Sequence, residues 1–333
     1  MSITICPNKV SPSVLAAREE LNRALEARYS ETRQWYEYPS PADYRRAELD
    51  DTTGFGKPIF DSEAIDFFLP SSHGDHSILL RQFIPKGKVS KGVFLHFHGS
   101  GFCISSARLN DGYLRHLADT LSLTVVTVNY RKAPEDPFPA PLDDAIDAAF
   151  FALALDGEQK LGGPLTIIGG ESAGAYLSVW ATLELRRRGI DVMSRIKGLV
   201  ASYGIYDLTY LPSVKNYSRR LVLNNEDTSR FIDTALPQDV FPLDVRKQPH
   251  LSPLYADLKG LPPALFLVGS EDPLLDDSVF LATKWGMAEN KTSLKIIPAA
   301  FHGFTLFPIG EMADEGIREI VDFVSALLDV KDW

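Results

Sequence analysis

The sequence predicts an α/β fold in which a mostly parallel sheet carries helices on both of its faces. Short, nearly continuous apolar stretches recur along the chain, among them GVFLHFHG, TVVTVNYR, PLTIIGG, IKGLVASYG, PALFLVG and SLKIIPA. Strands of a parallel sheet are buried on both faces, so their sequences are apolar throughout instead of alternating. Stretches with helical periodicity separate several of these strands, at residues 109–121, 142–155, 173–187 and 279–289. Such alternation indicates a parallel sheet with helical crossovers.

Further elements extend this pattern toward both ends of the chain. The stretches AIDFFLP and SILLRQFIP predict an early pair of strands, and residues 313–328 predict a final helix. Ser11 and Pro12 predict the start of an N-terminal helix, because serine caps a helix N-terminus and proline fits the first turn. Apolar residues then recur at helical spacing, which makes this helix amphipathic.

One long segment, residues 206–258, interrupts the alternation with prolines and short helical fragments. An irregular segment of that length inside a compact domain is usually functional or forms a subdomain. We therefore expect the N-terminal helices of residues 1–55 and the insertion at residues 206–258 to form a cap. The catalytic core would then consist of residues 56–205 and residues 259–333.

Composition and charge exclude several classes of protein. The 333 residues carry a formal net charge of −10, which disfavours binding to the phosphate backbone of a nucleic acid. The two cysteines, Cys6 and Cys103, are too few for a disulfide framework and favour a reduced environment. The N-terminal residues lack the pattern of a signal peptide, and no apolar run reaches the roughly 18 residues that suggest a membrane span. We expect a cytoplasmic protein without a membrane span.

The strongest motif is IIGGESAGAY, in which Ser172 lies between Gly170 and Gly174. It has the form G-x-S-x-G and stands between a predicted strand and a predicted helix, as a nucleophile elbow requires. A sharp turn there would hold the serine hydroxyl out of the sheet, and the two glycines would let strand and helix pack closely. The helix N-terminus behind Ser172 favours developing negative charge.

A serine hydroxyl is a weak nucleophile and needs a base that a third group holds in place. Two histidines follow Ser172 in the chain, His250 and His302. His302 follows the last predicted strand, where a loop can return it to the elbow. His250 lies in the proline-flanked part of the insertion and is expected at the surface. We therefore predict His302 as the base.

The acid is expected after the strand PALFLVG, where the chain reads SEDPLLDD. Asp272 precedes a proline and is fixed in a rigid turn, which favours it. Asp276 is the second choice and Glu271 the third. Asp276 and Asp277 also fit the start of the next helix, where carboxylates complement the helix dipole.

The stretch LHFHGSGFCI places a glycine-containing loop directly after an apolar strand. Glycines let a backbone turn sharply and approach a substrate closely. Attack by a serine on a carbonyl creates an oxyanion, and backbone N–H groups aimed at it are often the largest catalytic contribution. We expect the N–H groups of Ser100, Gly101 and Ala173 to form this oxyanion hole. His98 and Gly99 would support the loop, His98 through side-chain hydrogen bonds.

These motifs resemble the hormone-sensitive-lipase-like branch of the α/β-hydrolase fold, a group of carboxylesterases. The resemblance covers roughly residues 60–330. Beyond GESAG and HGSG, it includes NYRKAPEDPFPAPLDDA, YADLKGLPPALFLVGSEDPLLDD and HGF. It implies that Asp272 is the acid and that N-terminal helices and an insertion after the sixth strand form a lid. It also implies an intracellular enzyme without a cofactor that favours esters of short to medium acyl chains. Some relatives pair through their last strand and helix, which leaves a homodimer open.

Ser100 departs from the family pattern, which usually has glycine at this position. Its hydroxyl can donate a third hydrogen bond to the oxyanion or narrow the acyl pocket, and tolerance of bulky tertiary-alcohol esters is in doubt. We expect Phe102, Tyr203 and Tyr206 to line an apolar pocket. Trp180 is expected to pack in the core.

The sequence thus predicts a serine carboxylesterase that hydrolyses small-molecule esters through an acyl-enzyme on Ser172. Two other functions occur on the same scaffold, because a fold does not determine a function. One is a biosynthetic enzyme such as a dehydratase or cyclase, and the other is a small-molecule receptor. The sequence identifies neither the physiological substrate nor the oligomeric state.

Overall fold

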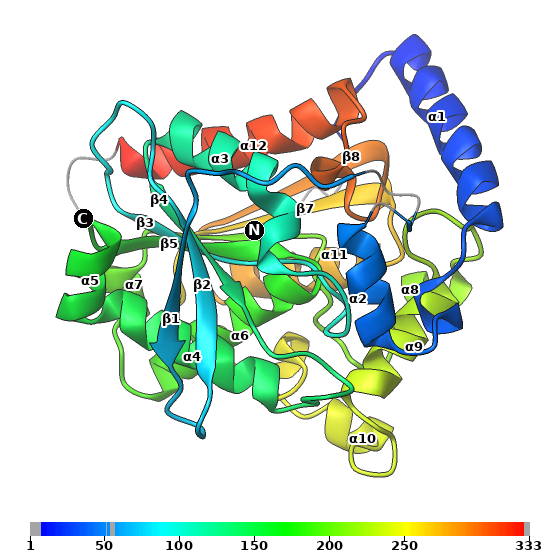
Figure 1. Cartoon of the computed structure of the whole chain (residues 1–333). Coiled ribbons are helices and arrows are strands. Elements are labelled where there is room, and N and C mark those ends of the chain that lie inside the picture. Colours follow the sequence, from blue (N-terminus) through cyan, green and yellow to red (C-terminus); the bar gives the residue numbers. More distant parts are fainter. Residues whose placement is uncertain (1–7, 51, 54–56, 330–333) are drawn as a thin grey trace.

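The computed structural model describes residues 8–50, 52–53 and 57–329, which form a central sheet surrounded by helices (Figure 1). The strands are β1 (Ile65–Pro70), β2 (Ser77–Phe83), β3 (Val93–Phe97), β4 (Thr124–Asn129), β5 (Leu165–Glu171), β6 (Gly198–Ser202), β7 (Ala264–Glu271) and β8 (Thr292–Phe301). They lie in the order β1-β2-β4-β3-β5-β6-β7-β8. β2 runs antiparallel to both of its neighbours, β1 and β4, and the other neighbouring strands pair in parallel. The predicted α/β fold with a mostly parallel sheet is therefore confirmed.

The helices fill the connections between strands. The α-helices are α1 (Pro12–Glu31), α2 (Pro41–Leu49), α3 (Asp111–Leu121), α4 (Ala140–Leu153), α5 (Leu155–Leu161), α6 (Ala173–Arg187), α7 (Val192–Arg195), α8 (Pro212–Asn216), α9 (Asn225–Ala235), α10 (Leu243–Arg246), α11 (Leu275–Met287) and α12 (Glu311–Leu328). Short 3₁₀-helices are η1 (Trp35–Glu37), η2 (Ala107–Asn110), η3 (Pro253–Tyr255) and η4 (Phe304–Leu306). Among the described residues no helix is long and apolar enough to cross a membrane.

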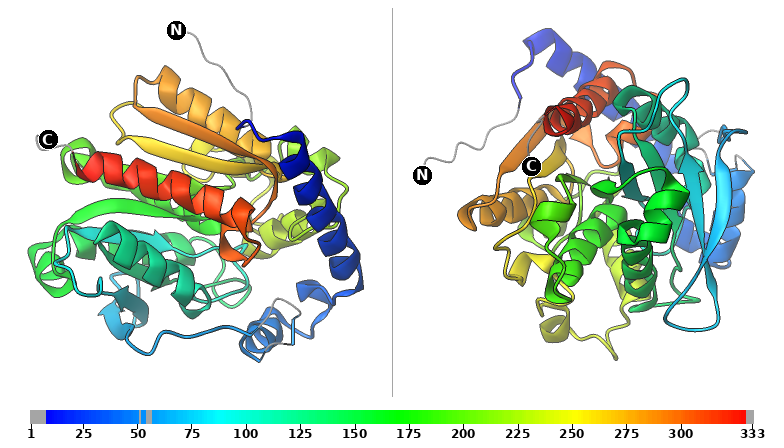
Figure 2. Two further views of the ribbon diagram at one scale, coloured as in Figure 1. Left: turned by 90° about the horizontal axis from the view of Figure 1, so that it is seen from above. Right: turned by 90° about the vertical axis from the view of Figure 1, so that its left-hand side faces the viewer.

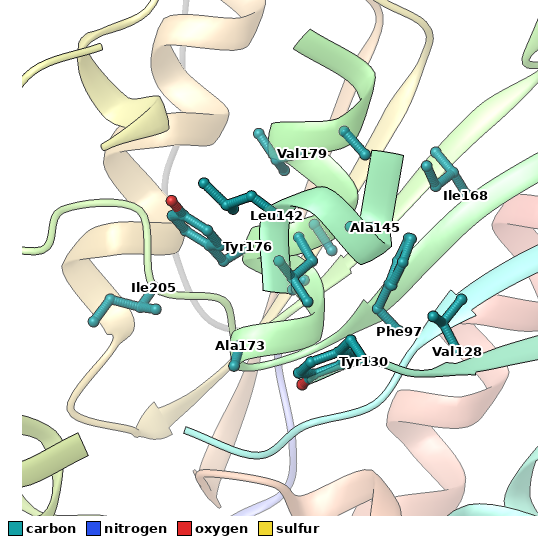
Figure 3. Packing of buried hydrophobic residues seen from close by; sticks show 14 of the residues in the cluster. Phe97, Val128, Tyr130, Leu142, Ala145, Ile168, Ala173, Tyr176, Val179 and Ile205 are labelled. Carbon is teal, nitrogen blue, oxygen red and sulfur yellow. The ribbon is translucent and has the colours of Figure 1, made fainter. Parts of the chain in front are cut away.

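Each face of the sheet has its own hydrophobic core. Helices α4, α6 and α11 cover one face, and α3 and α12 lie side by side over the other (Figure 2). Successive side chains of a strand point to opposite faces. Accordingly Leu95 and Phe97 pack under α4 and α6, whereas Phe94 packs under α3 and α12. Figure 3 shows part of the first core, where Phe97 lies near Tyr130 and Val128. Full burial of a side chain such as that of Phe97 contributes about 1.5–3 kcal/mol to the free energy of unfolding.

Helix α1 docks on the edge of the sheet through buried polar groups. The guanidinium of Arg18 donates a hydrogen bond to the carbonyl of Pro298 (3.1 Å) and forms an ion pair with Glu315 of α12 (2.6 Å). The amide of Asn22 donates to the carbonyl of Ala299 (2.7 Å). These contacts fix α1 beside the end of β8.

The N-terminal helices also contact the insertion at residues 206–258. Figure 1 shows α1, α2, α8 and α9 gathered at one end of the sheet. Trp35 of η1 stacks on Phe231 of α9 with ring centres 4.4 Å apart and planes 5° apart. Arg219 of the insertion forms an ion pair with Glu26 of α1 (3.2 Å). Two segments far apart in the sequence therefore form one layer beyond the carboxyl edge of the sheet.

Candidate active site

Ser172 stands in a strained turn between β5 and α6. Its φ of 54° and ψ of −119° are unfavourable for a residue with a side chain. The turn is held because the N–H of Ser172 donates to the carbonyl of Ser202 in the neighbouring strand (2.9 Å). The strain projects the hydroxyl away from the sheet, at the start of a helix.

Gly170 and Gly174 are required by the close approach of this turn to β3. A Cβ on Gly170 would lie 2.1 Å from the carbonyl oxygen of Phe97, and one on Gly174 would lie 1.9 Å from the same oxygen. Real Cβ atoms do not make such contacts, so only glycine fits at either position. The two glycines of the motif are therefore required by the close packing of the backbones of β3, β5 and α6.

The structure brings Ser172, His302 and Asp272 together from three parts of the chain. His302 Nε2 lies 2.9 Å from Ser172 Oγ. His302 Nδ1 lies 3.1 and 3.0 Å from the two carboxylate oxygens of Asp272. Because a carboxylate only accepts, Nδ1 carries the hydrogen, and Nε2 is free to accept the serine proton. Asp272 and His302 are both buried, with exposed fractions of 2% and 7%.

Neighbouring groups hold the carboxylate and the imidazole in this orientation. The N–H of Leu274 donates to Asp272 (2.8 Å), which fixes the carboxylate in its turn. The ring of Tyr203 meets the imidazole of His302 edge to face, with centres 5.1 Å apart. The hydroxyl of Tyr203 is hydrogen-bonded to that of Thr305 (2.7 Å). These contacts leave the imidazole little freedom to turn away from Ser172.

The residues considered as alternatives have other surroundings. His250 is exposed, and its carbonyl accepts a hydrogen bond from the indole of Trp180 (2.9 Å). Trp180 is half-buried and packs against the core, as expected. Asp276 accepts the N–H of Ser213 (2.9 Å). Glu271 forms an ion pair with a guanidinium of the insertion (2.8 Å).

Three residues that line the cavity beside Ser172 carry backbone N–H groups that are free to bind a ligand oxygen. The N–H groups of Ser100 and Gly101 have no acceptor among the residues that the structure describes. Ala173 is the first residue of α6, and the first N–H groups of a helix have no intrahelical acceptor. All three residues line the same cavity as Ser172 and His302. This arrangement can stabilise an anionic oxygen attached to the carbon that Ser172 attacks.

The hydroxyl of Ser100 takes part in hydrogen bonds within the protein. It accepts the N–H of Phe102 (2.8 Å) and lies 2.6 Å from the hydroxyl of Tyr130. Since Ser100 is only 5% exposed, its side chain belongs to the protein interior.

His98 supports the loop chiefly by stacking. Its imidazole stacks on the ring of Tyr130, with centres 4.5 Å apart and planes 14° apart. Its Nδ1 contacts the carbonyl of Gly99 (3.0 Å), and its Nε2 has no hydrogen-bond partner within the described part of the chain. Burial, and to a smaller extent the nearby ammonium of Lys132, hold the pKa of His98 well below its usual range. The ring is therefore neutral and acts as a packing element.

The cavity above Ser172 has a volume of about 1030 Å³ and is mostly bounded by apolar groups. Phe102 and Tyr203 line it, and so do Trp35 of the N-terminal segment and Phe231 of the insertion. Tyr206 does not line it. Tyr206 is fully buried and packs on Phe266 of β7, so its placement in the pocket is corrected.

A buried polar cluster beside Ser172 was missed by sequence reasoning. The carboxylate of Glu171, 2% exposed, lies 2.7 Å from Nε2 of His96. The other ring nitrogen of His96 lies 2.9 Å from the hydroxyl of Thr127. A charged residue inside an apolar strand segment was the available signal, because a buried carboxylate requires a partner. Neither this cluster nor any other group of His, Cys, Asp and Glu side chains in the described residues is arranged to hold a metal ion.

Comparisons with known proteins agree with this architecture. Residues 94–306 match the α/β hydrolase fold family. An esterase of Acinetobacter venetianus is 30% identical over 238 residues, which cover 71% of this chain and 75% of that protein. The structure is similar to that of a hyperthermophilic esterase from Pyrobaculum calidifontis, at 27% identity and a TM-score of 0.76, covering 97% and 99% of the two chains. It is also similar to a hormone-sensitive lipase from a metagenome library, at 27% identity and a TM-score of 0.77, covering 93% and 98%.

The fold and the serine-bearing turn thus define an α/β hydrolase. Within that class, the chain belongs to the hormone-sensitive-lipase-like carboxylesterase family, as its motifs suggested.

Proposed function

We propose that this protein is a serine carboxylesterase that hydrolyses small carboxylic esters through an acyl-enzyme on Ser172. The observation that carries the proposal is the continuous contact from Ser172 through His302 to Asp272, with every step between 2.9 and 3.1 Å. A nucleophile, a base and an orienting acid at such distances are what acyl transfer requires. Membership of a carboxylesterase family adds support for the reaction class.

The chemistry follows from the positions of these groups. His302 takes the proton of the Ser172 hydroxyl as the oxygen attacks the ester carbonyl. Asp272 keeps Nδ1 protonated and stabilises the imidazolium that forms. The imidazolium then donates its proton to the departing alcohol, which leaves an ester of Ser172. A water molecule is deprotonated in the same way, attacks this ester and releases the carboxylic acid.

The oxyanion formed in both steps would be held by the N–H groups of Ser100, Gly101 and Ala173. Each such donor contributes roughly 3–4 kcal/mol to the barrier reduction in enzymes where one was removed. The donors need not move when the charge develops, because they belong to a fixed loop and a helix start. The neutral state of His98 suits this role, since the loop then stays packed without a buried charge.

We also propose that residues 1–55 and 206–258 act as a cap over the site. The stack of Trp35 on Phe231 joins the two segments above the cavity. A mainly apolar cavity of about 1030 Å³ suits a short to medium acyl chain better than a long-chain lipid. Cytoplasmic location and absence of a cofactor remain part of this proposal.

Replacement of the nucleophile tests the proposed mechanism. Ser172→Ala should remove measurable turnover of p-nitrophenyl butyrate, because the remaining groups have no oxygen to acylate. The folded state should persist, as judged by circular dichroism and thermal unfolding. A panel of esters that varies in acyl length would show the preference for short to medium chains.

The outcome also separates the alternative functions. A biosynthetic enzyme would leave simple aryl esters intact in the unmodified protein. A receptor would bind a small molecule tightly without covalent labelling of Ser172 by a fluorophosphonate. Undiminished ester turnover in Ser172→Ala would refute the assignment of the nucleophile.

A further inference from the structure

We propose that Ser100 and Tyr130 are positioning residues that fix the oxyanion loop, residues 98–101, in its working conformation. This inference rests on the proposed esterase function, because the loop has such a role only if an oxyanion forms beside Ser172. Neither hydroxyl is assigned contact with the reacting atoms. Both would act through the backbone N–H groups of the loop.

The two hydroxyls belong to a hydrogen-bond chain that runs in one direction. The N–H of Phe102 donates to Ser100 Oγ (2.8 Å), and the hydroxyl of Tyr130 donates to the carbonyl of His98 (2.6 Å). The two hydroxyl oxygens are 2.6 Å apart. Because the single hydrogen of Tyr130 is used on His98, Ser100 must donate to Tyr130. These hydrogen bonds connect His98, Ser100 and Phe102 to the single side chain of Tyr130.

The backbone inside this chain needs such support. Gly101 and Phe102 have φ values of 53° and 64°, in the left-handed region. For Phe102 that conformation is unfavourable, and strained residues persist only where their surroundings hold them. The bond from the N–H of Phe102 to the Ser100 side chain closes the turn that serine forms with the second residue after it. The carbonyl of Phe102 is fixed as well, by the N–H of Ala133 (2.9 Å).

Tyr130 connects this turn to the rigid core. It follows β4 directly, is fully buried, and lies in the cluster around Phe97 and Ala173 (Figure 3). Its ring stacks on the imidazole of His98, so the loop is held by ring and hydroxyl together. A glycine in place of Ser100 would leave the N–H of Phe102 without this acceptor. Ser100 therefore restricts the backbone of the loop to one conformation, which a glycine at this position would not do.

Two variants remove the chain at different points. Ser100→Ala and Tyr130→Phe should each lower kcat for p-nitrophenyl butyrate by about 10- to 100-fold, less than the loss of a whole oxyanion donor can cost. KM should stay within about 3-fold of its original value, because substrate contacts are untouched. Affinity for an aryl trifluoromethyl ketone, which forms an oxyanion adduct with the nucleophile, should fall by the same factor as kcat. The double variant should have a kcat no lower than that of the less active single variant, because the two hydroxyls act as one unit.

Matched controls separate positioning from general stability. Tyr176→Phe removes a hydroxyl that is equally buried and donates to the carbonyl of Leu251 (2.7 Å), outside the cavity wall. It should leave kcat and ketone affinity unchanged even if unfolding occurs at a lower temperature. Ser100→Thr keeps the hydroxyl and should retain activity within about 3-fold of the original, since the hydrogen-bond chain survives.

Three results would overturn the inference. The first is that Ser100→Ala and Tyr130→Phe keep the kcat and the ketone affinity of the original protein. The second is a multiplicative loss in the double variant, and the third is a Ser100→Thr variant as impaired as Ser100→Ala. If the unmodified protein neither cleaves the ester nor binds the ketone, the proposed function and this inference fail together. An active protein with unimpaired loop variants refutes the positioning role alone.

Discussion

Gly174 shows how strictly the site depends on single atoms. A Cβ there would lie 1.9 Å from the carbonyl oxygen of Phe97 and 2.7 Å from that of His98. Alanine favours a helix over glycine by about 1 kcal/mol, but the clash is with backbone and cannot be relieved by a rotamer change. Overpacking should dominate, and we expect Gly174→Ala to lower the free energy of unfolding by more than about 3 kcal/mol. Urea denaturation measures this loss.

Gly286 is the matched control for that substitution. It lies in α11, and a Cβ there would meet Thr292 at 3.7 Å, an ordinary contact. Gly286→Ala should be neutral or slightly stabilising. Equal stability of the two alanine variants would contradict the packing account of the motif.

The sequence predicted which residues form the candidate site and how they are spaced, but not the directions of their side chains. The strand–turn–helix context of GESAG predicted the strained position of Ser172. The direction of the Ser100 hydroxyl depends on Tyr130, 30 positions away, so no local pattern could predict it. The same holds for Tyr206, whose aromatic ring fits a pocket and a core equally well until its neighbours are known.

Helix α9 shows two opposing electrostatic effects at the scale of an element. Asp227 lies in its first turn, where the helix dipole favours a carboxylate. Burial opposes this effect and is stronger, because it raises the pKa of Asp227 to about 6. The side chain is only 3% exposed, and Oδ1 has no hydrogen-bond partner within the described residues.

This pKa has a definite consequence for stability. Between the unfolded pKa of 3.8 and the folded pKa of about 6, the folded state binds more protons than the unfolded state. The contribution of Asp227 to the free energy of unfolding therefore falls as pH rises through that window. Relative to the original protein, Asp227→Asn should gain about 1–3 kcal/mol of stability between pH 4 and pH 7. Urea denaturation at both pH values checks this.

The neighbouring residue provides a control of opposite sign. Glu226 is exposed, and its hydrogen bond with Arg230 lowers the pKa of its carboxylate. Glu226→Gln should lose stability relative to the original protein as pH rises, because the favourable pair forms only when the carboxylate is charged. A gain in Glu226→Gln, or no pH dependence in Asp227→Asn, would contradict these environments.

Element types followed from periodicity, but boundaries did not. The strand stretches and the helix at residues 173–187 match the structure closely. The helix expected at residues 279–289 begins earlier, at Leu275, because Asp276 and Asp277 supply the acidic first turn that a helix N-terminus favours. Asp277 also accepts the N–H of Tyr206 (2.6 Å), a contact across 71 positions that no periodic signal contains.

At the scale of the whole molecule, the site exists because parallel strands end at one edge of the sheet. The oxyanion loop follows β3, Ser172 follows β5, Asp272 follows β7 and His302 follows β8. This convergence follows from the order of strands and could be anticipated from the sequence. The sequence also predicted a cap of residues 1–55 and 206–258, but not its contacts, since the stack of Trp35 on Phe231 joins segments without a shared pattern. Cys6 lies outside the described residues.

Covalent trapping tests the central claim most directly. The protein is treated with a fluorophosphonate, and the intact mass and the modified peptide are determined by mass spectrometry. We expect one equivalent of label on Ser172, complete loss of ester hydrolysis at that stoichiometry, and much slower labelling in His302→Ala. Loss of hydrolysis with the label on another residue, or full hydrolysis by protein labelled on Ser172, would contradict the account.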